Sequence, residues 1–175
     1  MLKMEVVPGI ELKLLEKHHG EPFFEFIEKG RADFENWIPF VSETTSLEKA
    51  VARIEVYLKL FVQGRGYFWC LWHRDRIIGL VLIKDIDRNA LSAEIGYMID
   101  PDFAEKGIIS RSCRMMIGFL FDELQMNRIV ICCDEENERS SGIAKRFGFE
   151  CEGVLKQSIR INGTLRNTMV WGLMK

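Results

Sequence analysis

No segment of this sequence is apolar for long enough to cross a membrane. Every apolar run falls well short of the roughly 18–20 residues that a bilayer requires. The opening segment, Met1–Gly9, also lacks the continuous apolar core and the small-residue cleavage site of a signal peptide. We therefore expect no membrane partner and a cytoplasmic location.

An excess of charge of one sign is also missing. The 24 Lys and Arg residues nearly balance the 26 Asp and Glu residues, which gives a formal net charge of −2. Sequence-independent binding of DNA or RNA needs a clustered basic surface, so we expect no direct nucleic-acid partner. The three histidines, His18, His19 and His73, show no metal-ligand spacing, so we expect no metal cofactor.

The five cysteines contain no C-x-x-C pair, and five is an odd number. Cys132 and Cys133 are adjacent, and on a strand their side chains would point to opposite faces. The pattern favours reduced thiols in the core of a cytoplasmic protein over a disulfide framework.

What the sequence does contain is enough apolar material, 47% of 175 residues, for one folded domain over residues 1–175. Alternating and β-branched segments predict strands at Ile10–Leu14, Tyr67–Trp72, Ile77–Ile86, Leu91–Ile99 and Arg128–Cys133, and a terminal hairpin over Glu150–Met174 around Asn162 and Gly163. Short polar links between the early strands favour antiparallel pairing.

Helical periodicity is found in four places. It predicts one or two short helices over residues 20–40, broken near Gly30 and Pro39, a helix that Thr45 and Glu48 cap and that buries Leu47, Val51, Ile54, Leu58 and Phe61, and helices at Ile108–Leu124 and Glu138–Phe147. The fold class is therefore α+β, with a mixed, mostly antiparallel sheet, helices on both of its faces and a βαβ unit.

The βαβ unit contains a strand, a loop and a helix start that suit a phosphate group. The strand Glu94–Ile99 leads into the loop Asp100–Lys106, and Gly107 opens the helix. A helix N-terminus has free N–H groups and a positive dipole end, and glycine lets the backbone approach an oxygen closely. Taken alone, this pattern is more often an ordinary connection. The full P-loop and dinucleotide-binding spacings are absent.

Four motifs in order carry a resemblance to a known family. They are Glu94-Ile95-Gly96-Tyr97, Lys106-Gly107-Ile108, Asn137-x-x-Ser140 and Phe147-Gly148-Phe149. The chain resembles the Gcn5-related N-acetyltransferases (GNAT), and within them the RimJ/RimL type that acetylates ribosomal-protein N-termini. It looks most like the Bacillus ribosomal-protein-serine acetyltransferases.

The resemblance implies a GNAT fold with acetyl-CoA as cosubstrate. It assigns the pantetheine arm to the backbone of Met98 and Ile99, with Asn137 bonding the arm from the other side. A splay between this strand and Arg128–Cys133 would free those backbone groups. The pyrophosphate is assigned to the loop Glu105, Lys106, Gly107, Ile108, Ile109 and Ser110. Glu105 replaces a family glycine and Ile109 a small residue, so we expect both side chains to turn away from the pyrophosphate.

Amine acetylation needs a base, and Glu94 is the candidate, acting directly or through water. A carboxylate on an apolar strand has its pKa raised by burial, which suits a base. The alternative is a structural Glu94, paired with an arginine or near a sheet edge. Many family members place a tyrosine acid where this chain has Ala144, so Ser140 is the candidate acid, with helix capping as its alternative. The oxyanion is expected at a backbone N–H near Met98.

The acceptor is predicted to be a primary amine, in first place the N-terminal α-amine of a ribosomal protein. Trp37 and Phe40 lie in a segment that looks like the family's W-L-P-W element near the acceptor. Two other interpretations stay open: acetylation of a small amine, such as a polyamine or an aminoglycoside, and a non-catalytic acyl-CoA-binding module. The terminal hairpin and the surface aromatics are compatible with a homo-oligomer.

Overall fold

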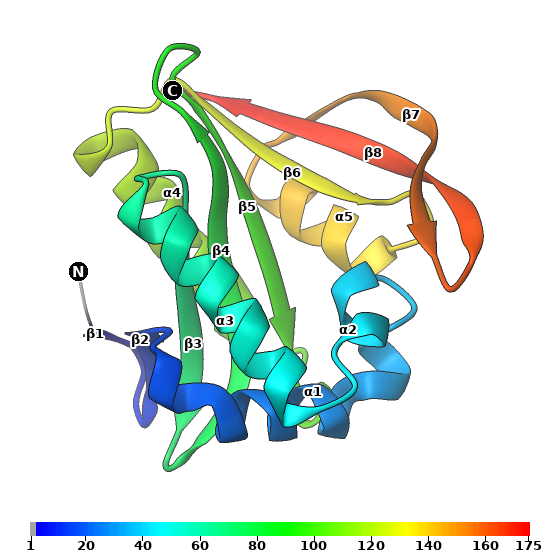
Figure 1. Cartoon of the computed structure of the whole chain (residues 1–175). Coiled ribbons are helices and arrows are strands. Elements are labelled where there is room, and N and C mark those ends of the chain that lie inside the picture. The colour runs from blue at the N-terminus through cyan, green and yellow to red at the C-terminus, as the bar shows by residue number, and fades with distance from the viewer. Residues whose placement is uncertain (1–2) are drawn as a thin grey trace.

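The computed structural model describes residues 3–175 and is built on one eight-stranded sheet with the order β1-β2-β3-β4-β5-β6-β8-β7 (Figure 1). The first two residues of the Met1–Gly9 segment lie outside it. The strands are β1 (Lys3–Val7), β2 (Ile10–Leu14), β3 (Tyr67–His73), β4 (Arg76–Asp87), β5 (Ser92–Ile99), β6 (Arg128–Asp134), β7 (Glu150–Ile161) and β8 (Thr164–Met174). Only β5 and β6 pair in parallel, so the predicted mixed sheet is confirmed.

Helices cover both faces of this sheet. They are α1 (Gly20–Phe34), α2 (Pro39–Glu43), α3 (Leu47–Val62), α4 (Ile108–Gly118) and α5 (Glu138–Arg146). The larger core cluster joins the sheet to α4 and α5, and a second cluster joins β3, β4 and the end of β5 to α1, α2 and α3. Within the described part of the chain, no helix is long and apolar enough to cross a membrane.

Strand β5 separates the two clusters by the alternation of its side chains. Ala93 and Ile95 are buried in the α4 cluster, and Met98 is buried in the α1–α3 cluster. Because alternate residues of a strand share a face, Glu94 projects on the same side as Met98. The strand predicted over Leu91–Ile99 is therefore confirmed, and its side chains divide between the two faces of the sheet.

The predicted break at Gly30 is wrong, because α1 runs through it. A Cβ on Gly30 would lie 2.1 Å from the ring of Phe34, which folds back over this position. The glycine therefore provides space for an aromatic ring and does not end the helix. Pro39 starts α2 at its first turn, where proline costs no hydrogen bond.

The start of α3 lies one residue later than predicted. Ser46 is the N-cap, and its hydroxyl accepts the N–H of Lys49 at 3.4 Å. The predicted Thr45–Glu48 capping box is therefore wrong, and the buried stripe shifts with it. The α3 residues buried in the core are Ala50, Ile54 and Tyr57, whereas Leu47 is 41% exposed.

Two further elements differ from the sequence prediction. Strand β1 was not predicted, because only Val6 of its five residues is buried and the apolar pattern is correspondingly weak. The helix predicted over Ile108–Leu124 changes from α to π hydrogen bonding at Phe119–Glu123. The π turn still buries Leu120, so the predicted apolar stripe keeps its role.

Candidate active site

The predicted splay between β5 and β6 is present. Only three residue pairs join the two strands: Ser92 with Arg128, Ala93 with Ile129 and Glu94 with Val130. Beyond Glu94, β5 continues to Ile99 and β6 to Asp134, but the two strands no longer pair with each other. Each stays paired on its other side, β5 with β4 and β6 with β8. The two strands diverge in Figure 1, and α5 lies beside the opening.

The alternation of backbone hydrogen bonds decides which groups of β5 face this opening. The N–H of Asp100 donates to the carbonyl of Ile78 on β4, and the β4–β5 register is regular from Gly79↔Ile99 to Lys84↔Glu94. In an antiparallel pair, every second residue bonds to the partner strand. Met98 therefore bonds to β4, whereas the N–H groups of Tyr97 and Ile99 face the opening.

The loop before α4 has the geometry of an anion site. Gly107 takes the left-handed conformation at φ 73°, and a Cβ there would meet nothing within 4 Å. The 11-residue α4 follows directly, with its first N–H groups at this loop. Ile109 is 9% exposed and packs in the main core, so it turns inward as expected.

Glu105 also turns away, because it is exposed, but its backbone is strained. Its φ is 62°, in the left-handed region that favours glycine, the residue that the family resemblance implies at this position. A glutamate at position 105 therefore brings a conformational cost as well as an unfavourable charge.

We expect Glu105→Gly to stabilise the fold by about 0.5–1 kcal/mol, because relief of the left-handed strain exceeds the entropy cost of glycine. The KM for acetyl-CoA should fall, since a carboxylate beside the loop is removed. Urea unfolding and steady-state kinetics measure the two effects. Glu105→Ala is the matched control: it removes the charge and keeps the strain, so equal stability of the two variants contradicts the strain argument.

Basic side chains gather at the same loop, and one of them was not predicted. Lys106 points back, with its Nζ 2.7 Å from the carbonyl of Asp102. Arg146, in the last turn of α5, donates to the hydroxyl of Ser110 at 2.6 Å. Arg146 is far away in sequence, so only the fold brings it to the start of α4.

Glu94 lies at the apex of the splay with its side chain 16% exposed. Burial raises its pKa above the usual range, and the ammonium of Lys84, 2.9 Å away on β4, holds the pKa down in part. The backbone N–H of Cys132 also bonds to the carboxylate and lowers the pKa. The partner is thus a lysine and not an arginine, and the position is central in the sheet.

Lys84 was not predicted, because its role depends on the register between β4 and β5. Lys84 and Glu94 are directly paired across the two strands. A lysine inside the apolar segment Val81–Ile86, opposite the only carboxylate of β5, was the available signal.

Ser140 does not cap α5. The cap is Asn137, whose side-chain oxygen accepts the N–H of Ser140 at 3.0 Å. The hydroxyl of Ser140 instead lies 3.0 Å from the hydroxyl of Tyr97 on β5, and this contact bridges the opening of the splay. Burial raises the pKa of Tyr97, so its phenol stays protonated. The sequence indicated Tyr97 only as part of the Glu94-Ile95-Gly96-Tyr97 motif and assigned no role to its hydroxyl.

The two catalytic candidates approach the splay from opposite faces of the sheet. Glu94 projects on the side of α1 and α3, and Ser140 comes from α5 on the side of α4. Asn137 uses its side-chain oxygen for the cap, and in the described chain its side-chain nitrogen has no hydrogen-bond partner. That nitrogen is the group left for a ligand.

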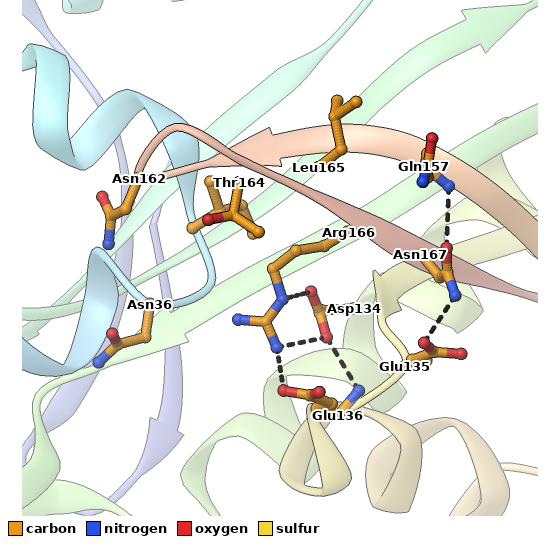
Figure 2. A pocket seen from close by; sticks show the side chains of 11 residues that line it. Asn36, Asp134, Glu135, Glu136, Gln157, Asn162, Thr164, Leu165, Arg166 and Asn167 are labelled. Atoms are coloured by element: carbon orange, nitrogen blue, oxygen red, sulfur yellow. Dashed lines mark hydrogen bonds and ion pairs between the residues drawn. The ribbon is translucent and has the colours of Figure 1, made fainter.

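A hollow of about 510 Å³ lies on the Glu94 side of the sheet, where β6 ends (Figure 2). Asp134, Glu136 and Arg166 meet in it, and Asn36 closes it from the end of α1. Trp37 does not line this hollow itself, but its ring lies 5.5 Å from the guanidinium carbon of Arg166, which does.

Phe40 lies apart from Trp37 and belongs to the helices. Its ring packs edge-on against Tyr57 at 6.5 Å and lies 5.2 Å from the guanidinium carbon of Arg53 on α3. Within residues 3–175, no group of three or more His, Cys, Asp or Glu side chains is placed to hold a metal ion.

A sheet that opens between two parallel strands, a glycine-bearing helix start at one side and a buried carboxylate at the apex define an acyl-CoA-dependent acyltransferase. The family model described as an acetyltransferase (GNAT) domain matches residues 10–150, and the chain belongs to this family. The predicted family and fold are confirmed. The chain is therefore an acetyl-CoA-dependent N-acetyltransferase.

Known proteins of similar sequence extend over nearly the whole chain. YdaF of Bacillus subtilis (strain 168), whose assignment as a ribosomal N-acetyltransferase is provisional, is 28% identical over 100% of this chain and 96% of its own length. The ribosomal-protein-serine acetyltransferase of Escherichia coli (strain K12) is 28% identical over 91% of this chain and 89% of its own length.

The fold also matches solved structures. The structure of RimL, a ribosomal alpha-N-protein acetyltransferase in complex with coenzyme A, superposes with a TM-score of 0.92 over 98% of this chain and 97% of that chain. The sequence identity is 22%, so this likeness concerns the fold alone.

Proposed function

We propose that the chain transfers the acetyl group of acetyl-CoA to the N-terminal α-amine of a protein, in first place a ribosomal protein. The observation that carries the proposal is the partly buried Glu94, which lies where the splay begins and beside backbone of β5 that β6 leaves unpaired. The names of the two relatives above support a ribosomal acceptor.

The residues present fit acetyl-CoA. The N–H groups of Tyr97 and Ile99 offer an unpaired strand edge for the amides of the pantetheine arm, with the side-chain nitrogen of Asn137 opposite. The start of α4, where Gly107 leaves open space, suits the pyrophosphate, and Arg146 adds positive charge there.

Glu94 and Ser140 divide the proton transfers. A protein N-terminus has an ordinary pKa of about 8, so part of it must lose a proton at neutral pH. Glu94 takes that proton, and its raised pKa makes it a stronger base than an exposed glutamate. A free N–H of Tyr97 or Ile99 stabilises negative charge on the acetyl oxygen. Ser140, hydrogen-bonded to the hydroxyl of Tyr97, passes a proton to the departing sulfur and takes one back from water, so that the free thiol leaves and the hydroxyl is restored.

The direct test is the intact mass of ribosomal proteins and N-terminal peptides after incubation with acetyl-CoA. We expect a gain of one acetyl group at the α-amine, located by fragmentation. Thiol release with a polyamine or an aminoglycoside and none with any peptide would overturn the protein acceptor. Saturable acetyl-CoA binding without acceptor-dependent thiol release would favour a binding module.

We expect Lys84→Met to move the acidic limb of the pH profile of kcat/KM to higher pH. Lys84 holds the pKa of Glu94 down, so its removal raises that pKa, and a higher pH is then needed to obtain the basic carboxylate. The measurement is kcat/KM across pH with a fixed peptide. Lys13→Met, which removes a lysine paired with Glu11 on β2, is the matched control. A limb that stays in place, or moves to lower pH, contradicts the assignment.

We expect Ser140→Ala to lower kcat roughly tenfold, less than loss of a typical general acid, because a thiol of pKa about 8.5 is already a good leaving group. Helix α5 should stay intact, since Asn137 is its cap. Asn137→Ala is the comparison and should cost about 1 kcal/mol of stability. If Ser140→Ala loses stability but keeps the wild-type kcat, the hydroxyl of Ser140 has a structural role and no catalytic one.

A further inference from the structure

Beyond Glu94, no helix within residues 3–175 packs on one face of β6 and β8. The side chains of Val130, Cys132, Thr168 and Val170 on this face are each partly exposed, and we call these four residues the acceptor strip. The opposite face of β6 is buried under α4 and α5. In the part of the chain that the structure describes, no residue of β6 or β8 belongs to the α1–α3 cluster.

The acceptor strip connects Glu94 with the hollow of Figure 2. Glu94 pairs with Val130 at the near end, and Asp134 lies four residues further along β6 on the same face. At about 3.3 Å per residue the two carboxylates are about 13 Å apart along the strand. An extended peptide with its α-amine at Glu94 therefore brings about its fifth residue, four positions after the first, to the hollow.

The hollow carries excess negative charge. Three carboxylates line it beside one guanidinium: Asp134 and Glu136 pair with Arg166, and Glu135 accepts a hydrogen bond from the side chain of Asn167. Asp134 is 2% exposed and holds Arg166, whose Nε lies 2.7 Å from its Oδ2. Glu135 and Glu136 are exposed, and 72% of the Glu136 side chain is accessible. These two carboxylates can meet a cation without losing a buried contact.

The polar groups around the hollow favour a peptide over a polyamine. The side-chain oxygens of Asn36 and Asn162 and the amide of Gln157 have no partner among residues 3–175. The Gln157 amide and the Thr164 hydroxyl can donate, which suits the carbonyls of a peptide backbone. A protonated polyamine accepts no hydrogen bond and leaves those donors unused.

We infer that the acceptor is a polypeptide whose extended N-terminal segment lies along the acceptor strip, with a basic residue about four positions from the acetylated amine held by Glu135 and Glu136. This inference rests on the proposed function and names the acceptor's chemistry. It assigns specificity to two residues that are separate from the reacting atoms.

The test uses eight-residue peptides that differ only in where lysine, alanine or glutamate stands, at positions two to seven. We expect the lysine peptide to exceed the glutamate peptide in kcat/KM roughly three- to tenfold, with the maximum at position five, since each exposed ion pair contributes a few-fold. The effect should lie in KM. In the double variant Glu135→Gln/Glu136→Gln the lysine-to-glutamate ratio should fall to about one. Glu21→Gln/Glu25→Gln, two exposed carboxylates of α1, is the matched control and should keep the ratio.

Three results would overturn the inference. The first is equal kcat/KM for all charge positions while every peptide is acetylated, which leaves the proposed function intact. The second is a lysine preference that the Glu135/Glu136 double variant retains. The third is a polyamine that is acetylated faster than any peptide and loses this advantage in the double variant. Absence of acetyl transfer to every peptide would instead remove the proposed function and the inference together.

Discussion

Replacing Glu94 by glutamine lowers kcat about 10²- to 10⁴-fold, the contribution of a positioned general base. Glutamine keeps the size of the side chain and still accepts the hydrogen bond from Lys84, but it cannot take a proton from an ammonium group. Binding of acetyl-CoA should change little, since Glu94 projects to the face opposite α4 and its loop. The measurement is turnover with saturating peptide, beside the Kd of acetyl-CoA from titration calorimetry.

The matched control for this variant is Glu11→Gln. Glu11 is also a strand carboxylate paired with lysines, Lys3 and Lys13, but it lies on β2, far from the splay. We expect it to keep wild-type turnover. If Glu94→Gln also stays within about threefold of wild type, Glu94 is a structural partner of Lys84 and the base must be sought elsewhere.

Replacing Asp134 by alanine costs about 3 kcal/mol of unfolding free energy, because it leaves Arg166 without its buried partner. The carboxylate is 2% exposed, receives Arg166 at 2.7 Å and also accepts the backbone N–H of Glu136 at 2.9 Å. The value lies at the low end for buried pairs because Arg166 is 22% exposed. For a chain of this size the loss lowers Tm by roughly 6–12 °C.

Glu136→Ala is the comparison for this stability prediction. Glu136 also pairs with Arg166, but its side chain is 72% exposed, and exposed ion pairs contribute at most about 1 kcal/mol. Thermal and urea unfolding of the two variants separate the cases. A loss below 1 kcal/mol for Asp134→Ala would show that Arg166 finds other partners. Asp134 would then contribute to the negative charge of the hollow, as Glu135 and Glu136 do, more than to stability.

The sequence predicted the parts of the fold that depend on local periodicity. It predicted a strand over Leu91–Ile99, and β5 lies there, with Glu94 and Met98 on one face. The turn at Asn162 and Gly163 joins β7 to β8 as predicted, since this dipeptide suits a tight hairpin. The predicted helix break at Gly30 was wrong, because this glycine makes room for the ring of Phe34 in the next turn of α1. How that ring packs does not follow from the sequence pattern.

The site was predictable only where a single segment forms it. The start of α4 follows from consecutive residues, and Gly107 has the conformation that its role requires. Lys84, Tyr97 and Arg146 act through partners on other elements, which needs the strand register and the placement of α5. A homo-oligomer, the cytoplasmic location and the single-domain organisation over residues 1–175 stay predictions.

Only three residue pairs join β5 to β6, and this short contact, the seam, affects the stability of the protein when a ligand is bound. So short a seam leaves the two parts of the sheet weakly joined, and a molecule that bonds to both sides of the opening acts as a brace. A ligand that binds only the folded chain stabilises it by RT ln(1 + [L]/Kd), about 2.7 kcal/mol at a hundred times Kd. Resistance of the enzyme to unfolding and proteolysis then rises with the concentration of any ligand that carries the pantetheine arm and the pyrophosphate, acetyl-CoA and free coenzyme A alike.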